Sequence, residues 1–395
     1  MGFIKTPEIL LPKDYLDYKK WAVIACDQFT SEKDYWYTLK KRVDNVPSTY
    51  HLILPEAFLD EDTDHKIAEV NDNMELYLRS NIFDRHKGFV LINRRTPYVE
   101  RRLGLVLAVD LEAYEYKEDK EGLIRSTEAT VQERIPPRMH IRKHASLELP
   151  HVQLLVDDKE GIIDHLYERK NDFKKLYDFD LNMGGGHLQG YLIEETRDVI
   201  RAFETIESTI KMIVGDGNHS LAAAKAHWEN VKEETDEMNH PARYALVEVI
   251  SLYDEGLSVA PIHRIIYNAD EDLLQSLQML EGSNTLNVFH EGKKNTIYIS
   301  DNPFEAVRQI QDTLDRYLMT HKEATIDFVH GLSSLKRLIG DHRHALGIVM
   351  PKVEREALFP YIKVNGPLPR KTFSLGEAKE KRYYMEARII KKGMR

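Results

Sequence analysis

A glycine-rich segment between two apolar stretches has the residue types to bind an anion. Residues 210–225 read Ile-Lys-Met-Ile-Val-Gly-Asp-Gly-Asn-His-Ser-Leu-Ala-Ala-Ala-Lys, which predicts a strand, a tight turn and a helix rich in alanine. The first N–H groups of a helix carry the positive end of its dipole, and glycine lets a phosphate approach the backbone closely. We therefore expect a phosphate or nucleotide to bind at Gly215, Asp216, Gly217, Asn218, His219 and Ser220.

Two side chains of this turn would take part in the chemistry. His219 would donate a hydrogen bond or a proton to a bound phosphate group. Asp216 would hold a magnesium ion or cap the helix. The alternative is an ordinary turn between a strand and a helix, in which Asp216 and Asn218 only satisfy helix N–H groups.

An arginine-rich stretch offers positive charge for the same ligand. Arg134, Arg138 and Arg142 recur every four residues. A helix would place Arg138 and Arg142 on one face, where guanidinium groups can bind phosphate oxygens or a carboxylate. Glu128, in the same stretch, is a candidate base toward a hydroxyl group. The alternative is a solvated amphipathic helix with ordinary ion pairs.

Charged residues also follow two expected strands. Asp27 comes directly after the apolar residues 21–26, and strand ends collect functional side chains in α/β folds. It is a second candidate base, with a helix cap as the alternative. His263 and Arg264 are adjacent at an expected strand end, where they would bind a carboxylate or a phosphate.

The C-terminal residues 363–395 reverse the charge of the rest of the chain, with ten Lys or Arg against three Glu. Three interpretations are open: a basic face over an anionic ligand, a nucleic-acid patch, or solvated charge, which is the default. Arg370 and Lys371 follow the extended, proline-containing residues 366–369 and are further candidates for binding phosphate.

Several of these segments resemble a widespread prokaryotic family of unknown function, domain-of-unknown-function family 1015, which is often labelled SpoOJ/ParB-like. The turn resembles the family's Asp-Gly-His-His-Arg turn, and the resemblance extends over nearly the whole chain. The other matching segments are Ala25-Cys-Asp-Gln28, Glu133-Arg-Ile-Pro-Pro-Arg138, Leu149-Pro-His151, Pro261-Ile-His-Arg264 and Leu368-Pro-Arg-Lys-Thr-Phe373.

The turn is also similar to that of the ParB/sulfiredoxin superfamily, whose members place a Gly-x-His-Arg turn under the phosphates of a nucleotide. One branch contains kinases of free L-serine, and members of the present family are often encoded beside enzymes of the phosphorylated serine pathway. The resemblance thus implies a role connected with phosphoserine. Asn218 stands where the kinases have His and sulfiredoxins their Cys, which excludes sulfiredoxin chemistry, and Ser220 stands where Arg is expected.

The elements that position these residues alternate between strands and helices, which predicts an α/β protein with a mixed sheet. The resemblance implies a ParB/sulfiredoxin-like core, and a composition change near residue 267 predicts a main domain over 1–267 and a C-terminal α/β subdomain over 268–395. Strands are expected at 21–26, 51–54, 88–92, 103–109, 151–156, 210–214 and 244–250, and helices at 64–79 and 193–205. The subdomain is expected to hold helices at 268–282 and 303–320 and a hairpin of 286–289 with 296–299.

Composition limits the class of protein. The 395 residues are 42% hydrophobic, enough for a sizeable core, and 55 Lys and Arg against 65 Asp and Glu give a net charge of −10. This charge disfavours a dedicated nucleic-acid binder. Cys26 is the single cysteine, which excludes an internal disulfide and a cysteine zinc site. We expect a cytoplasmic protein, because no membrane-length apolar run and no signal peptide is present.

These observations predict magnesium-assisted phosphoryl transfer between a nucleotide, ATP or ADP, and a small hydroxy amino acid, serine or phosphoserine first. Glu128 or Asp27 would accept the hydroxyl proton, with Mg²⁺ near Asp216. The partners would be small molecules, without nucleic acid or membrane, and the sequence leaves homo-oligomer formation open. Two alternatives remain: a phosphatase or other hydrolase acting on the same substrate, and a nucleotide-binding ParB-like regulator without turnover.

Overall fold

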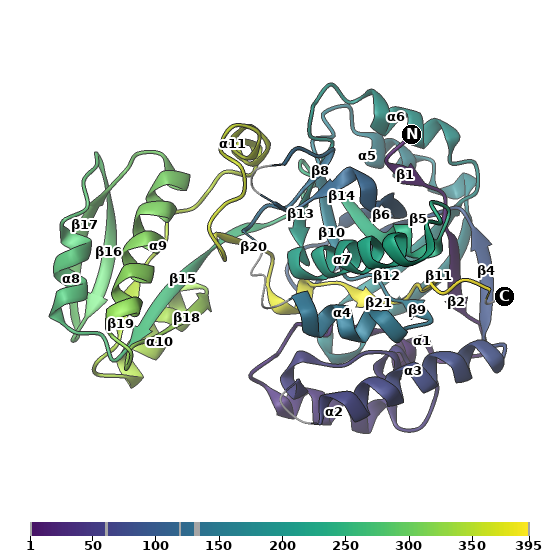
Figure 1. The fold of residues 1–395 in the computed structure, drawn as a ribbon, viewed down its shortest axis with the longest axis horizontal. Helices are drawn as coiled ribbons and strands as arrows, with labels where there is room; N and C mark the ends of the chain where they lie inside the picture. The colour runs from purple at the N-terminus through teal and green to yellow at the C-terminus, as the bar shows by residue number, and fades with distance from the viewer. Residues whose placement is uncertain (1, 60–61, 118–119, 130–134, 394–395) are drawn as a thin grey trace. The chain divides into compact units, whose positions relative to one another are not determined.

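A computed structural model describes residues 2–59, 62–117, 120–129 and 135–393. Within them the protein is mixed α/β, with helices α1 to α11 and a large mixed sheet, which confirms the expected class. The chain forms two compact units (Figure 1). Unit 1 comprises Met1–Ser126, Thr130–Leu257 and Ala378–Arg395, and unit 2 comprises Thr127–Ala129 and Ser258–Glu377.

The units differ from the division expected near residue 267. The chain passes from unit 1 to unit 2 at residue 258, directly before strand β15 (Val259–Tyr267). This strand belongs to unit 2 because its hydrogen-bonding partners β18, β19 and β20 all lie there. The chain then returns to unit 1 at Ala378, so the last residues are not part of a C-terminal subdomain.

Unit 1 is built on a ten-stranded sheet in the order β11-β12-β5-β6-β14-β10-β13-β8-β7, with β1 added on β6. Strand β10 pairs in parallel with β14 and antiparallel with β13, so the sheet is mixed at its centre. The strands are β1 (Ile4–Lys5), β5 (Phe89–Arg95), β6 (Arg102–Asp110), β7 (Tyr114–Glu115), β8 (Ile124–Arg125), β10 (Gln153–Val156), β11 (Lys174–Asp180), β12 (His187–Ile193), β13 (Met212–Asp216) and β14 (Tyr244–Ser251).

Alternate residues of the central strands belong to two cores, one on each face of this sheet. Leu91 and Val247 pack with helices α5, α6 and α7, whereas their neighbours Val90 and Leu246 pack with α2 and α3. Continuously apolar strands are typical of a sheet covered on both faces. The helices are α2 (Lys33–Val43), α3 (Thr63–Arg79), α5 (Ile162–Glu168), α6 (Arg197–Thr205) and α7 (Asn218–Thr235).

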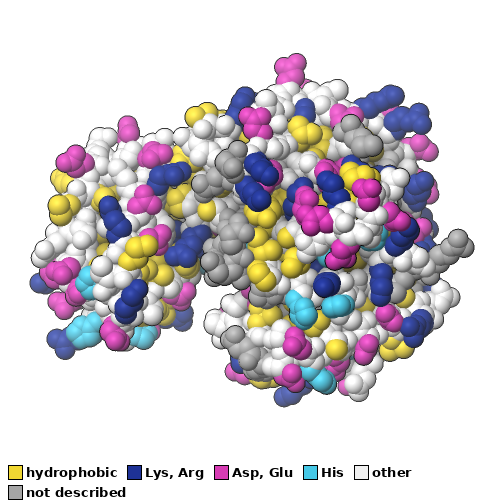
Figure 2. All heavy atoms as spheres, in the orientation of Figure 1, with side chains coloured by type: hydrophobic (Ala, Val, Ile, Leu, Met, Phe, Trp, Pro, Cys, Tyr) yellow, Lys and Arg dark blue, Asp and Glu magenta, His cyan; other side chains and the backbone are white. Residues whose placement is uncertain are grey.

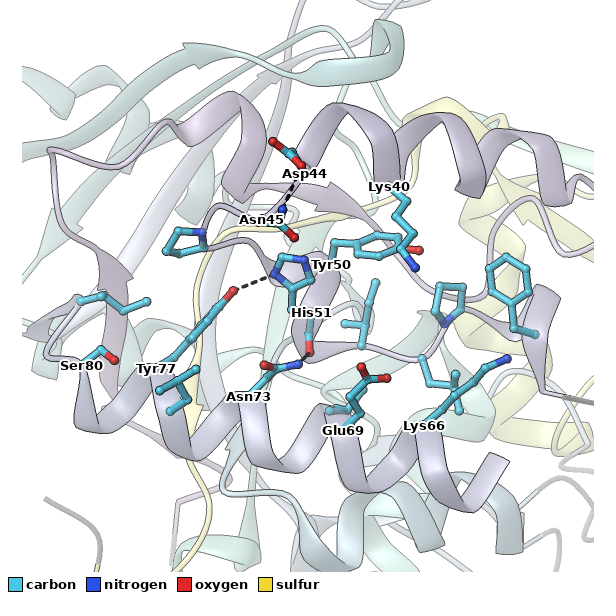
Figure 3. A pocket seen from close by; sticks show the side chains of 18 of the residues that line it. Lys40, Asp44, Asn45, Tyr50, His51, Lys66, Glu69, Asn73, Tyr77 and Ser80 are labelled. Atoms are coloured by element: carbon cyan, nitrogen blue, oxygen red, sulfur yellow. Dashed lines mark hydrogen bonds between the residues drawn. The ribbon is translucent and has the colours of Figure 1, made fainter. Parts of the chain in front are cut away.

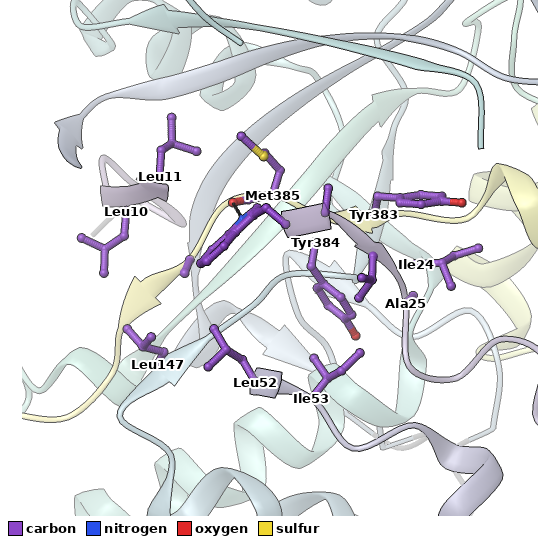
Figure 4. Close-up of a cluster of buried hydrophobic side chains, with 14 of the residues drawn as sticks. Leu10, Leu11, Ile24, Ala25, Leu52, Ile53, Leu147, Tyr383, Tyr384 and Met385 are labelled. Carbon is purple, nitrogen blue, oxygen red and sulfur yellow. Dashed lines mark hydrogen bonds between the residues drawn. The ribbon is translucent and has the colours of Figure 1, made fainter. Parts of the chain in front are cut away.

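Short elements complete unit 1, and two of them use the C-terminal tail. Strand β21 pairs with β3, and β22 pairs with β9. Figure 4 shows Tyr383, Tyr384 and Met385 of this tail within a cluster of apolar side chains. Helix α4 packs against α7 (Figure 1). These elements are α1 (Tyr18–Trp21), β2 (Glu8–Pro12), β3 (Val23–Ile24), β4 (Phe83–Lys87), α4 (Ile135–His144), β9 (Leu147–Glu148), β21 (Tyr383–Tyr384) and β22 (Arg388–Ile389).

Unit 2 has a six-stranded antiparallel sheet in the order β17-β16-β19-β15-β18, with β20 added on β15. The expected hairpin and both expected helices are present. The strands other than β15 are β16 (Asn284–His290), β17 (Lys293–Ile299), β18 (Thr325–His330), β19 (Leu346–Ile348) and β20 (Phe373–Leu375). The helices are α8 (Glu271–Gln278), α9 (Pro303–Thr320), α10 (Leu332–Asp341) and α11 (Leu358–Asn365).

Two expectations from the sequence are wrong. The strand expected at 51–54 is replaced by a 3₁₀ turn at Thr49–Leu52, because Ser48 accepts a hydrogen bond from the Tyr50 N–H at 3.1 Å and caps the turn. The basic tail is not solvated throughout: Lys381, Arg382 and Arg388 are buried in unit 1 and paired with carboxylates. Their burial was missed because the partners are distant in sequence.

The surface in view does not concentrate one sign of charge. Figure 2 shows Lys and Arg side chains interspersed with Asp and Glu over the visible face. Among the described residues, no helix is both long enough and apolar enough to cross a lipid bilayer.

Trp228 tests the core beneath α7. Its side chain is fully buried against the sheet and its indole N–H donates to Glu112 Oε1 at 2.5 Å. We expect Trp228→Ala to lower the free energy of unfolding by about 3–5 kcal/mol, because a large buried side chain is lost and a cavity remains. Urea denaturation followed by far-UV circular dichroism measures the change. The control Leu76→Ala removes a half-exposed side chain of α3 and should leave stability nearly unchanged; equal losses would contradict this description of the core.

Candidate active site at the start of helix α7

The glycine turn joins the end of β13 to the start of α7. Gly217 has φ 87°, and a Cβ atom there would lie 3.1 Å from the Cα and Cγ2 atoms of Val152, so only glycine fits. The first helical hydrogen bond runs from the Leu221 N–H to the Gly217 carbonyl, at 3.0 Å. The helix therefore starts directly at the turn, and the positive end of its dipole lies there.

The side chains of the turn are held by other parts of unit 1. The Lys381 ammonium lies 3.1 Å from Asp216 Oδ2, and the Ser126 hydroxyl donates to Asn218 Oδ1 at 2.6 Å. Lys381 is buried, whereas the Asp216 side chain keeps 24% exposure. A positive charge therefore already lies next to the glycine turn, although the sequence has no arginine at position 220.

Asp216 does not fit the role of a magnesium ligand. Its carboxylate faces the Lys381 ammonium, and a divalent cation there would be repelled by that charge. Among the described residues, the one group of three possible ligands close enough to share a metal is Asp270, Asp272 and His321, in unit 2.

Ser220 begins a chain of hydrogen bonds. Its Oγ lies 2.8 Å from His151 Nε2, and His151 Nδ1 lies 2.8 Å from the Tyr384 hydroxyl. That hydroxyl accepts from the Cys26 N–H at 3.1 Å and donates to Cys26 Sγ at 3.2 Å. The chain thus connects the first turn of α7, the segment just before β10, the C-terminal tail and the segment just after β3.

These four side chains line a cavity of about 150 Å³ in unit 1. Most of its wall is aliphatic, and Figure 4 shows Leu52, Ile53 and Leu147 near Tyr384. The polar side chains that line it besides the hydrogen-bonded chain are Glu56, Arg138, Arg142 and Glu148. The cavity has the size of a small metabolite and has ionisable groups on its wall.

Two carboxylates lie near the cavity. Glu56 forms an ion pair with Arg138, while Gln28 donates to Asp27 Oδ1 at 2.9 Å. Burial raises the pKa of Glu56. The positive charge of Arg138 lowers this pKa, and the negative charge of the nearby Asp27 raises it. Burial, together with Asp27 and Glu56, raises the pKa of Cys26 to about 12, so its thiol stays protonated at neutral pH.

Arg142 forms an ion pair with a buried carboxylate on the cavity wall. It lies 2.5 Å from Glu148 Oε2, and Arg388 Nε lies 2.6 Å from Glu148 Oε1. All three side chains are at least four-fifths buried. Burial alone would raise the pKa of Glu148, but Arg388 and Arg142 together lower it below its ordinary value.

The structure brings together part of the residues proposed from the sequence. Asp27, the turn residues 215–220, Arg138 and Arg142 belong to unit 1. Arg134 lies outside the described residues. The remaining candidates belong to unit 2 and not to the unit that carries the turn: Glu128, His263, Arg264, Arg370 and Lys371.

Inside unit 2, these candidates have structural partners. His263 and Arg264 follow one another on β15, so they point to opposite faces. His263 Nδ1 accepts from the Met350 N–H at 3.2 Å, and the fully buried Arg264 donates to Gln311 Oε1 at 3.2 Å. Burial lowers the pKa of Arg264 to about 10, against the opposing effect of Glu128.

The last two candidates lie nearer the surface of unit 2. Arg370 forms an ion pair of 3.3 Å with Asp315, and its carbonyl accepts from Arg264 at 3.2 Å. Lys371 is exposed and has φ 57°, a backbone conformation typical of a tight turn.

Sequence reasoning missed Glu56, Tyr384 and Lys381. Glu56 is the one acid directly after the apolar residues 52–55, which is a weak signal for a carboxylate at a cavity wall. In the tail, Arg382, Tyr384, Glu386 and Arg388 alternate with other residues and are all buried. Large polar side chains at every second position of the sequence were the signal that could have predicted a buried extended segment here.

A second hollow of unit 1, about 770 Å³, contains none of the proposed residues. Figure 3 shows it between α2 and α3, with His51 and Tyr77 pointing toward one another. His51 Nδ1 lies 2.8 Å from the Tyr77 hydroxyl, and burial lowers the pKa of His51. Ile53 and Leu54 line both hollows, so residues 53–54 separate this hollow from the cavity.

The fold and the turn define the chain as a mixed α/β protein with a Gly-Asp-Gly-Asn-His sequence at a strand–helix junction. It belongs to the family described as "Protein of unknown function (DUF1015)", whose sequence model matches residues 10–334. The match confirms the family resemblance stated above. None of the curated proteins matches this chain.

Solved structures with a similar fold are distant. A conserved hypothetical protein from Pyrococcus furiosus is 10% identical, with a TM-score of 0.38 over 71% of this chain and 90% of its own. A free serine kinase in complex with AMP is 9% identical, with a TM-score of 0.42. The match covers 72% of this chain and 91% of the kinase chain. SbnI with a C-terminal truncation, from Staphylococcus aureus, is 8% identical, with a TM-score of 0.37. The match covers 73% of this chain and 84% of the SbnI chain.

Glu148 tests the buried ion pairs beside the cavity. We expect Glu148→Gln to lower the free energy of unfolding at pH 7 by about 3–5 kcal/mol, because two buried guanidinium groups lose their anion. The pKa of Glu148 is lowered in the folded protein, so its stabilisation is present above the ordinary carboxyl pKa and is lost as the pH falls through the folded value. Urea denaturation measured from pH 7 down to about pH 3 should therefore show that the difference in free energy of unfolding between Glu148→Gln and the wild type becomes smaller.

The control for this measurement is Glu8→Gln, which removes an exposed ion pair with Arg85 and should leave stability nearly unchanged. A difference in free energy of unfolding between Glu148→Gln and the wild type that stays constant with pH would contradict a lowered pKa of the Glu148 carboxyl group.

Proposed function

We propose that the protein transfers a phosphoryl group between a nucleotide, ATP or ADP, and a small hydroxy amino acid, serine or phosphoserine first. One observation carries the proposal: Ser220 belongs both to the glycine turn at the start of α7 and to the wall of the 150 Å³ cavity. A phosphate on the turn and a small hydroxyl compound in the cavity would therefore be neighbours, as phosphoryl transfer requires.

The phosphate end of the site uses the turn. The dipole of the 18-residue helix α7 favours a negatively charged ligand at the start of this helix. His219 is partly exposed in the first helical turn, where we propose that it donates to a phosphate oxygen. The ammonium of Lys381, held beside Asp216, provides charge compensation near the ligand.

The acceptor end uses the cavity. We propose Glu56 as the base for the hydroxyl proton, with Asp27 beside it, and Arg138 as the group that binds the substrate carboxylate. A carboxylate with a raised pKa is a better base near neutral pH than an ordinary one, and burial raises the pKa of Glu56. Glu128, the base expected from the sequence, belongs to unit 2, so the unit 1 carboxylates take this role in the proposal.

Phosphorus NMR tests the proposal. The purified protein is offered ATP, ADP or phosphoserine, each with and without L-serine, in the presence of Mg²⁺ and again with EDTA. Phosphoserine formed from nucleotide and serine is the expected result, and loss of the signal in EDTA would support the magnesium dependence. Inorganic phosphate from phosphoserine alone would indicate a phosphatase, and no change in any mixture would contradict catalysis.

Two substitutions separate the proposed roles. We expect Glu56→Gln to lower kcat by about 10²–10⁴-fold, because the base is lost, and His219→Ala to abolish detectable turnover. Thermal unfolding should change little for His219→Ala, because its side chain is partly exposed. The matched control Glu69→Gln removes an exposed carboxylate of α3 and should keep wild-type turnover. Full activity of either site variant would contradict the assigned role.

A further inference from the structure

Ser220 and His151 have the geometry of a nucleophile and its base. Ser220 Oγ lies 2.8 Å from His151 Nε2, and both side chains are partly exposed and line the same cavity. A serine hydroxyl is a weak nucleophile until a neighbouring base accepts its proton. A direct hydrogen bond to an imidazole nitrogen, in a cavity that a substrate can enter, meets this requirement.

The hydrogen bonds of Tyr384 are compatible with a proton on Nδ1 of His151. A tyrosine hydroxyl has one proton and two acceptor positions. When its proton is directed at Cys26 Sγ, the hydroxyl accepts from the Cys26 N–H and has its second acceptor position for a proton on His151 Nδ1. With its proton on Nδ1, His151 presents Nε2 as an acceptor to the Ser220 hydroxyl, the tautomer that a general base needs.

This arrangement is stable at neutral pH. Burial, Cys26 and Asp27 raise the pKa of Tyr384 well above its ordinary value, so the phenol keeps its proton. The pKa of the Cys26 thiol is raised to about 12, so it keeps its proton too. Both groups are neutral, and Tyr384, which is 1% exposed, is fixed by packing. Tyr384 is therefore a positioning residue for His151.

The start of α7 also suits the product of an attack by Ser220. The positive end of the α7 dipole lies in the same turn as the Ser220 hydroxyl. It favours negative charge on oxygens bound to a phosphorus attached to Oγ.

We propose that Ser220 carries the phosphoryl group covalently between donor and acceptor, with His151 as its base. The proposal rests on the proposed function for the identity of the donor, a nucleotide. In the first step the Ser220 Oγ–P bond forms, the bond between phosphorus and the leaving nucleotide oxygen breaks, and the hydroxyl proton passes to His151 Nε2.

In the second step the acceptor oxygen bonds to phosphorus and the Oγ–P bond breaks. His151 returns its proton to Ser220 Oγ, and the acceptor's proton passes to the Glu56 carboxylate and then to water. If water takes the place of the hydroxy amino acid, the same intermediate releases inorganic phosphate. One covalent species therefore accounts for both the transferase and the phosphatase as alternative fates.

An alkyl fluorophosphonate tests the nucleophile without any nucleotide, because it phosphonylates activated serines with loss of fluoride. We expect one adduct, on the peptide that contains Ser220, detected by mass spectrometry. Ser220→Ala should abolish it and His151→Gln should slow it by about a hundredfold. The controls Ser208→Ala and His227→Gln, the latter on the same helix, should label as the wild type does. Absence of a Ser220 adduct in the wild type would overturn the proposal.

Tyr384→Phe tests the positioning role, because it removes one oxygen and keeps the buried ring. We expect the labelling rate to fall and its pH profile to shift, since His151 Nδ1 loses its acceptor, while the melting temperature changes little. A labelling rate and pH profile equal to those of the wild type would overturn the role of Tyr384.

ATP–ADP exchange without acceptor separates this proposal from the proposed function. Transfer of label from ADP into ATP, with phosphate recovered on Ser220, supports the covalent carrier. Phosphoserine production by Ser220→Ala at the wild-type rate would overturn the carrier and leave the proposed function standing. A Ser220 adduct with the fluorophosphonate in a protein that never uses nucleotide would support the nucleophile and contradict the proposed function.

Discussion

The buried guanidinium of Arg382 is the interaction on which the site of unit 1 depends. It donates to the Pro150 carbonyl at 2.8 Å and to Glu248 Oε2 at 3.0 Å, and it pairs with Glu386. A charge buried this deeply is costly unless all its donors are satisfied. Because Glu248 lies on β14 and Pro150 precedes β10, these bonds hold the C-terminal tail against the middle of the large sheet in one register.

The neighbours of Arg382 are positioned by this anchor. Lys381 reaches Asp216 at the turn, and Tyr384 reaches His151 and Cys26 beside the cavity. Arg388, further along, pairs with Glu148. The tail thus supplies the positive charge beside the glycine turn and the hydroxyl group that orients His151. A segment far from the turn in sequence therefore completes the site, while the turn itself is formed by local sequence.

The sequence predicts what local patterns determine. The apolar run that ends at Asp216 and the alanine-rich stretch after Gly217 become β13 and α7, because periodicity and glycine placement act within a few residues. The buried tail could not be predicted in this way. Glu248, which pairs with Arg382, and Glu148, which pairs with Arg388, are each more than a hundred residues away in sequence, and isolated basic residues near a chain end are ordinarily solvated. Likewise, Glu128 and Asp27 are both candidate bases by sequence, yet only the folded chain reveals that they belong to different units.

The central claim is that the phosphate donor and the small acceptor occupy the turn and the cavity of unit 1. Hydrogen–deuterium exchange, read by mass spectrometry with the β,γ-imido analogue of ATP and L-serine, tests it most directly. The account predicts slower exchange in the peptides that cover residues 212–225 and 52–58 when both ligands are present, with the first of these also protected by the nucleotide analogue alone. Protection confined to other peptides, or no protection at ligand concentrations in the millimolar range, would contradict the account.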